Sequence, residues 1–320
     1  MKIKDIGGEL GLIERIKNKI KQSPKEVIAG IGDDAAVLKY NEKEHLLFKM
    51  DMLIEDVHFS LEYSSPEQIG MKSIVQNVSD IASMGGLPKF ALISLALPKN
   101  TEVDFVDKVY DGINIISKKY KLNIVGGNVT SSKEISISTS LIGFVEKRHL
   151  TLRSGAKIGD LIFCTGDIGK SSVGLELLKR HINGQSIKKH LEPQCRLYLA
   201  RKLVKIGVNS MIDVSDGVAS EIKHICKQSN VGAIIYADKI PISKDTINDA
   251  KKIKKDPIDF ALYGGEDFEL IFTASKNKSK QLKKFEVTVI GEIVDKKYGV
   301  KLIKYGKKLN LQSGFNHFRN

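Results

Sequence analysis

Hydrophobic positions along the chain alternate between helical and strand spacing. Leu10, Ile13, Ile16 and Ile20 are three or four positions apart, which predicts an amphipathic opening helix. Apolar runs typical of strands follow at residues 35–39, 45–50, 90–97, 122–125 and 135–144. The first half of the chain therefore mixes strands with helices.

The clearest helix signal begins at Ser65. Ser65 followed by Pro66 is typical of an N-cap and a first helical residue, and apolar positions at helical spacing follow until Gly85-Gly86. A second helix is expected at about residues 102–119. These helices complete a first α/β half.

A second α/β series begins near Thr151. Its expected strands lie at residues 161–165, 211–214, 233–236, 269–273, 287–290 and 300–303, with helices near 171–182 and 195–206. No low-complexity linker separates the halves. The sequence therefore predicts a mixed α/β fold of two closely packed domains, residues 1–147 and 148–320.

Length and composition favour a protein that folds on its own. The chain has 320 residues, of which 42% are hydrophobic. Neither the apolar core of a signal peptide nor a run of about 18–20 apolar residues occurs. Cys164, Cys195 and Cys226 are far apart, so no zinc site or disulfide framework is indicated. We expect a soluble cytoplasmic protein with reduced thiols and no membrane partner.

The net charge of +13 raises the question of nucleic-acid binding. Lysine supplies most of the charge, singly or in short clusters such as residues 251–255, and aromatic residues are not interleaved with it as base-stacking platforms would be. A solvated lysine-rich surface that attracts anionic substrates is favoured, and no nucleic-acid partner is expected.

Residues 30–35 satisfy the dinucleotide pattern G-x-G-x-x-A. The pattern precedes a predicted strand instead of opening a helix, and the carboxylates of Asp33 and Asp34 would repel a pyrophosphate unless they held Mg²⁺. Gly169-Lys170-Ser171 is no P-loop, because Cys164 stands where the first glycine is required. The sequence therefore predicts a metal-bridged phosphate site.

Further acids occur where predicted elements end or turn. Asp51 follows a predicted strand, Asp80 lies on the polar side of the helix from residue 66, and Asp213 and Asp216 lie in a strand-to-helix turn. Each alone is more often a helix cap or a surface charge. Together with Asp34 they indicate a Mg²⁺ site.

Two glycine-rich segments accompany the acids. Residues 126–130 follow a predicted strand, a setting in which backbone N–H groups can form an anion nest. Residues 264–267 place Glu266 and Asp267 after two glycines, which suits recognition of a cationic group. Either segment is also consistent with an ordinary turn.

The ordered set of motifs resembles the bacterial thiamine-monophosphate kinase family. The matching segments are residues 8–13, 30–38, 57–59, 77–85, 153–156, 212–217, 264–270 and 314–318. The wider superfamily of aminoimidazole ribonucleotide synthetase and selenophosphate synthetase shares the acidic clusters. The N-terminal Cys beside a Gly-rich segment expected for selenophosphate synthetase is absent.

The resemblance implies a fold and a set of site residues. The N-terminal domain would pair with its twin in a homodimer, and the C-terminal domain would close over the site. Several Mg²⁺ ions would be held by Asp34, Asp51, Asp80, Asp213 and Asp216. ATP would be contacted by Tyr110, Gly127, Asn128, Arg153 and Ser215, and thiamine monophosphate by His58, Glu266 and Phe315.

The implied activity is ATP-dependent phosphorylation of thiamine monophosphate to thiamine diphosphate, the last step of that cofactor's biosynthesis. The acceptor phosphate is already mostly a dianion at neutral pH, so no general base is needed, and Arg153 would serve as a charge stabiliser in a direct in-line transfer. The alternatives are another ATP-dependent synthetase of the superfamily or a non-catalytic nucleotide-binding homologue.

The chain departs from the family pattern at two places. Gly126-Gly127-Asn128-Val129 stands where Gly-Gly-Asp-Thr is usual, and Lys49-Met50-Asp51 where many members have Ser-Thr-Asp. An amide replaces a carboxylate, and the Met50 side chain cannot be a hard-oxygen ligand. The number of metal ions is therefore left open.

Overall fold

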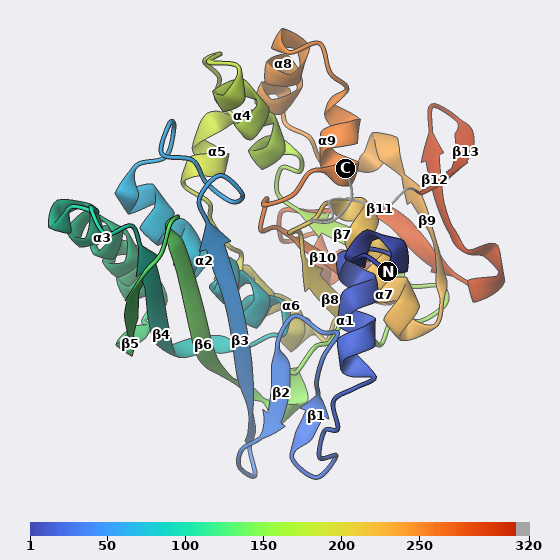
Figure 1. Cartoon of the computed structure of the whole chain (residues 1–320). Helices are drawn as coiled ribbons and strands as arrows, with labels where there is room; N and C mark the ends of the chain where they lie inside the picture. Colours follow the sequence, from blue (N-terminus) through green and yellow to red (C-terminus); the bar gives the residue numbers. More distant parts are fainter. Residues whose placement is uncertain (312–320) are drawn as a thin grey trace.

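The computed structural model describes residues 1–311, which form two mixed β-sheets with helices on their faces (Figure 1). The first sheet has the strand order β1-β2-β3-β6-β4-β5, and only β4 and β5 pair in parallel. Its strands are β1 (Val27–Ala29), β2 (Ala36–Lys39), β3 (Glu44–Ile54), β4 (Leu87–Leu97), β5 (Asn123–Ser131) and β6 (Ser136–Glu146).

Two long helices accompany this sheet, α2 (Pro66–Ser83) and α3 (Val103–Tyr120). The start of α2 follows the sequence signal, because the Ser65 hydroxyl accepts from the Gln68 N–H and the Gln68 side chain accepts from the Ser65 N–H. Most of α2 is buried between the first sheet and the second half of the chain.

The second sheet has the order β13-β12-β9-β11-β7-β10-β8, in which only β9 and β12 pair in parallel. Its strands are β7 (Leu161–Thr165), β8 (Ser210–Asp213), β9 (Gly232–Tyr236), β10 (Leu270–Ala274), β11 (Val287–Val294), β12 (Val300–Lys304) and β13 (Lys307–Asn310). Its helices are α4 (Lys170–Lys179), α5 (Ile187–Leu191), α6 (Leu197–Ile206), α7 (Val218–Ser229), α8 (Lys244–Lys252), α9 (Pro257–Tyr263) and α10 (Ser279–Leu282).

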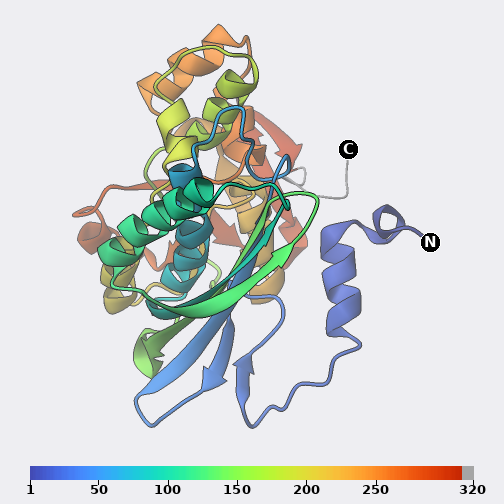
Figure 2. The same cartoon turned by 60° about the vertical axis from the view of Figure 1, so that its left-hand side comes forward.

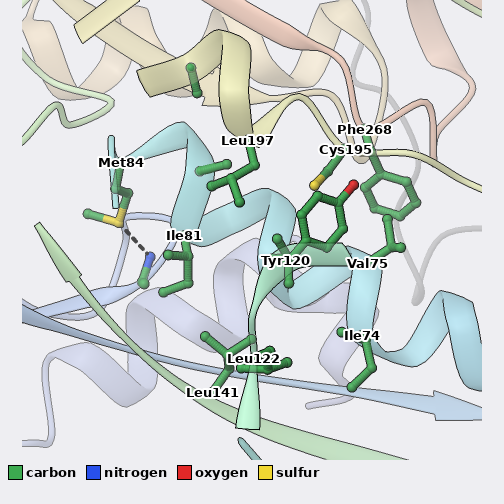
Figure 3. Packing of buried hydrophobic residues seen from close by; sticks show 14 of the residues in the cluster. Ile74, Val75, Ile81, Met84, Tyr120, Leu122, Leu141, Cys195, Leu197 and Phe268 are labelled. Atoms are coloured by element: carbon green, nitrogen blue, oxygen red, sulfur yellow. Dashed lines mark hydrogen bonds between the residues drawn. The ribbon is translucent and has the colours of Figure 1, made fainter. Parts of the chain in front are cut away.

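One hydrophobic core runs through both halves of the chain. Tyr120 and Val75 from the first half lie beside Cys195, Leu197 and Phe268 from the second (Figure 3). All five side chains are buried. A second core lies entirely within the C-terminal half.

The first helix, α1 (Glu9–Lys17), stands apart from both cores. None of its residues is buried, and an extended segment joins it to β1 (Figure 2). Its contact with the C-terminal half includes an ion pair of 3.3 Å between Glu14 and Lys227 of α7. Helix α1 is therefore held in place by contacts at the protein surface and not by packing into a core.

The predicted mixed α/β fold is confirmed, and two local predictions are wrong. Asp51 does not end a strand, because β3 continues to Ile54. The segment Gly126-Gly127-Asn128 is not a loop but lies within β5, paired with β4. Across residues 1–311, no helix has the length and apolar character needed to span a membrane.

Candidate functional site

A cleft of about 1330 Å³ is lined by both halves of the chain. Side chains from β3, α2, α7 and the loop before β10 reach it, and α1 borders it on one side. The cleft brings together the following residues predicted from the sequence: Asp51, His58, Asp80, Arg153, Asp213, Ser215, Asp216 and Glu266.

Three buried carboxylates form the centre of the site. One oxygen from each of Asp34, Asp80 and Asp213 lies within 4.8 Å of the others. Asp34 is positioned just before β2, where the Ala35 N–H donates to the Met84 sulfur at 3.1 Å (Figure 3). Asp80 comes from α2 and Asp213 from the end of β8, so folding joins residues far apart in sequence.

Two cations already contact this acid triad. The Arg153 Nε donates to Asp34 Oδ1 at 2.7 Å, and Lys49 Nζ lies 3.0 Å from Asp80 Oδ2. Asp213 Oδ2 accepts from the Ser79 hydroxyl at 2.5 Å. Its other oxygen, Oδ1, is buried and has no hydrogen-bond partner among the described residues. That orphaned oxygen is an open ligand position.

Burial makes the negative charge of the triad costly. It raises the pKa of Asp213 to about 7, with a further contribution from Asp34, and it raises the pKa of Asp80 despite the opposing effect of Lys49. Neighbouring Asp33 has a pKa raised to about 6 by burial and by Asp34. A hard divalent cation would relieve this cost, so the oxygen donors present fit Mg²⁺.

Asp51 and Asp216 lie beside the triad and not within it. Asp51 Oδ1 lies 3.1 Å from Lys49 Nζ, and Asp216 lines the cleft at the turn before α7. That turn is held by Glu221, a residue that the sequence prediction missed. Its Oε1 accepts from the backbone N–H groups of Asp216 at 2.9 Å and Ser215 at 3.3 Å. Burial and Asp216 raise the pKa of Glu221.

A second charged cluster surrounds Glu266. Lys72 Nζ lies 2.6 Å from Glu266 Oε1, and His190 Nδ1 lies 3.3 Å from Oε2. Burial raises the pKa of Glu266, but Lys72 and His190 outweigh it, so the net pKa is lowered and the carboxylate stays charged. Burial also lowers the pKa of His190 to about 4. Sequence reasoning missed Lys72, which occupies a buried position on α2.

His58 joins the Glu266 cluster through its backbone. Its carbonyl oxygen accepts from Lys72 Nζ at 2.6 Å, and its Nδ1 accepts from the Ile54 N–H at 3.1 Å. One buried lysine therefore ties the segment after β3 to the loop that carries Glu266.

The loop carrying Glu266 rests against the turn after β8. The Glu266 N–H donates to the Ser215 carbonyl at 2.9 Å, and Glu266 has a positive φ of 63°. A Cβ on Gly265 would lie 2.0 Å from the Ser215 carbonyl oxygen, so only glycine permits this approach.

We expect Gly265→Ala to separate the loop that carries Glu266 from the turn after β8 at Ser215. The added Cβ must displace Ser215 backbone, which should cost on the order of 1–3 kcal/mol of unfolding free energy. Thermal unfolding and metal titration of the variant check this. An unchanged melting temperature together with an unchanged metal affinity would contradict a close contact between Gly265 and the Ser215 backbone.

Three residues predicted to contact ATP lie away from the triad. Gly127 and Asn128 are on β5, three strands from β3 in the sheet order, or roughly 14 Å at the usual strand spacing. Tyr110 is on α3, at the β5 side of the same sheet (Figure 1). Phe315, predicted to contact thiamine monophosphate, lies outside the described residues.

Two family models cover most of the chain. Residues 32–145 match the N-terminal domain of AIR synthase related proteins, and residues 157–303 match the C-terminal domain. The thiamine-monophosphate kinase of Aquifex aeolicus (strain VF5) is 37% identical, over 99% of this chain and 100% of its own. The chain belongs to the thiamine-monophosphate kinase family.

Other members and structures agree with this assignment. The family member from Bacillus subtilis (strain 168) is 36% identical over 92% of this chain and 94% of its own. The structure of AaThiL complexed with AMPPCP and TMP has a TM-score of 0.89 at 37% identity and covers 99% of each chain. Hydrogenase maturation protein HypE in complex with ATP, at 18% identity and a TM-score of 0.71 over 88% of each chain, shares the fold.

Proposed function

We propose that the protein transfers the γ-phosphate of ATP to thiamine monophosphate and releases thiamine diphosphate. The observation that carries this proposal is the match to thiamine-monophosphate kinases along almost the whole chain. The cleft supports it, because two carboxylates of the buried triad, Asp80 and Asp213, line the same cavity as the separate charged Glu266.

The acid end of the cleft is proposed to hold ATP. Mg²⁺ bound there would neutralise phosphate charge, with Asp34, Asp80 and Asp213 as its central ligands and Asp51 and Asp216 beside them. Arg153 and the Ser215 turn border the same space and are proposed to contact the phosphates. Arg153 would have to share its guanidinium between Asp34 and the nucleotide.

The Glu266 end is proposed to hold thiamine monophosphate. The carboxylate, oriented by Lys72 and His190, can accept a hydrogen bond from the aminopyrimidine or face the cationic thiazolium. His58 lines the same part of the cleft. Phe315 stays a proposed stacking partner from the family resemblance.

The protein's part in the reaction is to align two anions. The acceptor phosphate is nucleophilic without a general base, because its second pKa is about 6. Lys49 and Arg153 place fixed positive charge beside the triad, which reduces repulsion between donor and acceptor. We therefore propose a direct in-line transfer with no phosphoenzyme.

We also propose a cytoplasmic homodimer of two-domain protomers, residues 1–147 and 148–320. On the face of the first sheet away from α2, strand alternation exposes an apolar strip of Phe48, Met50, Met52, Phe90, Leu92 and Val125. Asn128 is exposed and in register with Met52 across the sheet. Asn128 therefore faces away from the acid triad of its own protomer. If Asn128 contacts ATP, we propose that the nucleotide is the one bound by a second copy of the chain.

An assay of ATP consumption tests the proposed reaction. Thiamine monophosphate with Mg²⁺ should yield ADP and thiamine diphosphate in equal amounts. Turnover with aminoimidazole ribonucleotide precursors instead would identify a synthetase, and no turnover with either would identify a non-catalytic homologue.

A further inference from the structure

Lys49 lies where two acids of the site meet. Strand alternation points the neighbouring Phe48 and Met50 outward, at 46% and 59% exposure, and Lys49 inward toward α2. Its Nζ lies 3.1 Å from Asp51 Oδ1 and 3.0 Å from Asp80 Oδ2. One ammonium group therefore bridges two carboxylates that would otherwise face each other.

Two cations offset only part of the local negative charge. Lys49 and Arg153 provide two permanent cations against the carboxylates of Asp34, Asp51, Asp80 and Asp213. Two negative charges are left, which one divalent ion neutralises. The orphaned Oδ1 of Asp213 marks the side of the site where such an ion finds a free ligand atom.

We propose that the Lys49 ammonium is a built-in cation that takes the place of one divalent ion between Asp51 and Asp80. The proposal rests on the metal site of the proposed function. The lysine ammonium donates hydrogen bonds to the carboxylate oxygens of Asp51 and Asp80 that would otherwise coordinate a metal ion. Its positive charge also repels any second cation that comes within about 3 Å of it. The site therefore holds one divalent ion fewer than its carboxylates would otherwise bind.

The experiment counts bound Mn²⁺ by electron paramagnetic resonance, without nucleotide. The Lys49→Ser variant should bind one more Mn²⁺ per protomer than the parent. Its affinity for Mn²⁺ between Asp51 and Asp80 should be at least about tenfold higher than that of the parent at the same position. Lys49→Arg should keep the parental count. Lys179→Ser, which removes another lysine lining the cleft, should also keep it.

Two further measurements guard against a variant that folds poorly. Lys49→Gln keeps hydrogen-bond donors but not the charge, and should also gain the ion. Mn²⁺ should raise the melting temperature of Lys49→Ser and Lys49→Gln by several degrees more than that of the parent. Adding Asp51→Asn to Lys49→Ser should return the count to the parental value.

An unchanged Mn²⁺ count in both Lys49→Ser and Lys49→Gln would overturn the proposal. So would a gain that survives Asp51→Asn. The count requires neither ATP nor thiamine monophosphate, so it is independent of whether the proposed phosphorylation is observed.

Discussion

Asp213→Asn should abolish turnover and at the same time stabilise the metal-free protein. Loss of a charged ligand for Mg²⁺ is expected to lower kcat by at least about a thousandfold. Burial raises the pKa of Asp213 to about 7, so the folded state pays for the charged form above that pH. Removing the charge should raise the unfolding free energy by a few kcal/mol at pH 8.

The pH dependence gives this prediction its sign. A carboxyl with a raised pKa in the folded state binds protons there before it does in the unfolded state, so parental stability increases as pH falls from about 7 toward 4. The advantage of Asp213→Asn should therefore be largest above pH 7 and shrink toward pH 4. Calorimetry in metal-free buffer measures it. A variant less stable than the parent at pH 8 would contradict the prediction that the charged form of Asp213 destabilises the folded state.

Glu266→Gln should weaken the binding of thiamine monophosphate and leave the binding of ATP nearly unaffected. The amide cannot balance Lys72, so an uncompensated buried ammonium would face the cationic thiazolium. A charged hydrogen bond is typically worth about 1.5–3 kcal/mol, which predicts a KM for thiamine monophosphate about 10- to 150-fold higher. Steady-state kinetics with each substrate varied in turn measures this.

Glu269→Gln provides the matched control for Glu266→Gln. Glu269 is likewise ion-paired, with Lys189 at 3.1 Å and Arg196 at 2.5 Å, but it is buried and does not line the cleft. Its substitution should lower the melting temperature and leave both KM values unchanged. If Glu266→Gln weakened ATP alone, Glu266 would belong to the nucleotide end of the cleft.

The local elements could be predicted from the sequence where spacing and capping agree. The strand at 161–165 matches β7, and Ser65-Pro66 marks the start of α2. The extension of β5 through Gly126-Gly127 was not predictable, because glycine pairs usually end strands. Gly127 is needed there because a Cβ would lie 1.7 Å from the Ile93 carbonyl oxygen on β4, a contact that only the folded sheet reveals.

The candidate site was predicted in part for the same reason. The acids could be identified as residue types beside turns, but their partners depend on contacts distant in sequence. Ser79 and Asp213 are 134 positions apart, and Arg153 and Asp34 are 119 apart. Lys72 did carry a signal, because a lysine stands on α2 between the buried Ile69 and Val75. A buried cation on an apolar helix stripe requires a counter-charge within reach, and the partly buried Glu266 provides it.

The core shared by both halves restricts how the cleft can open. Phe268 follows Glu266 by two residues and packs with Tyr120 and Val75 of the first half (Figure 3). A wide hinge rotation at residues 147–156 would expose these side chains to water, at roughly 1.5–3 kcal/mol for each large one. Substrate entry by such a rotation is therefore disfavoured. By contrast, α1 borders the cleft and buries none of its residues, so a displacement of this helix would expose no core side chain to water.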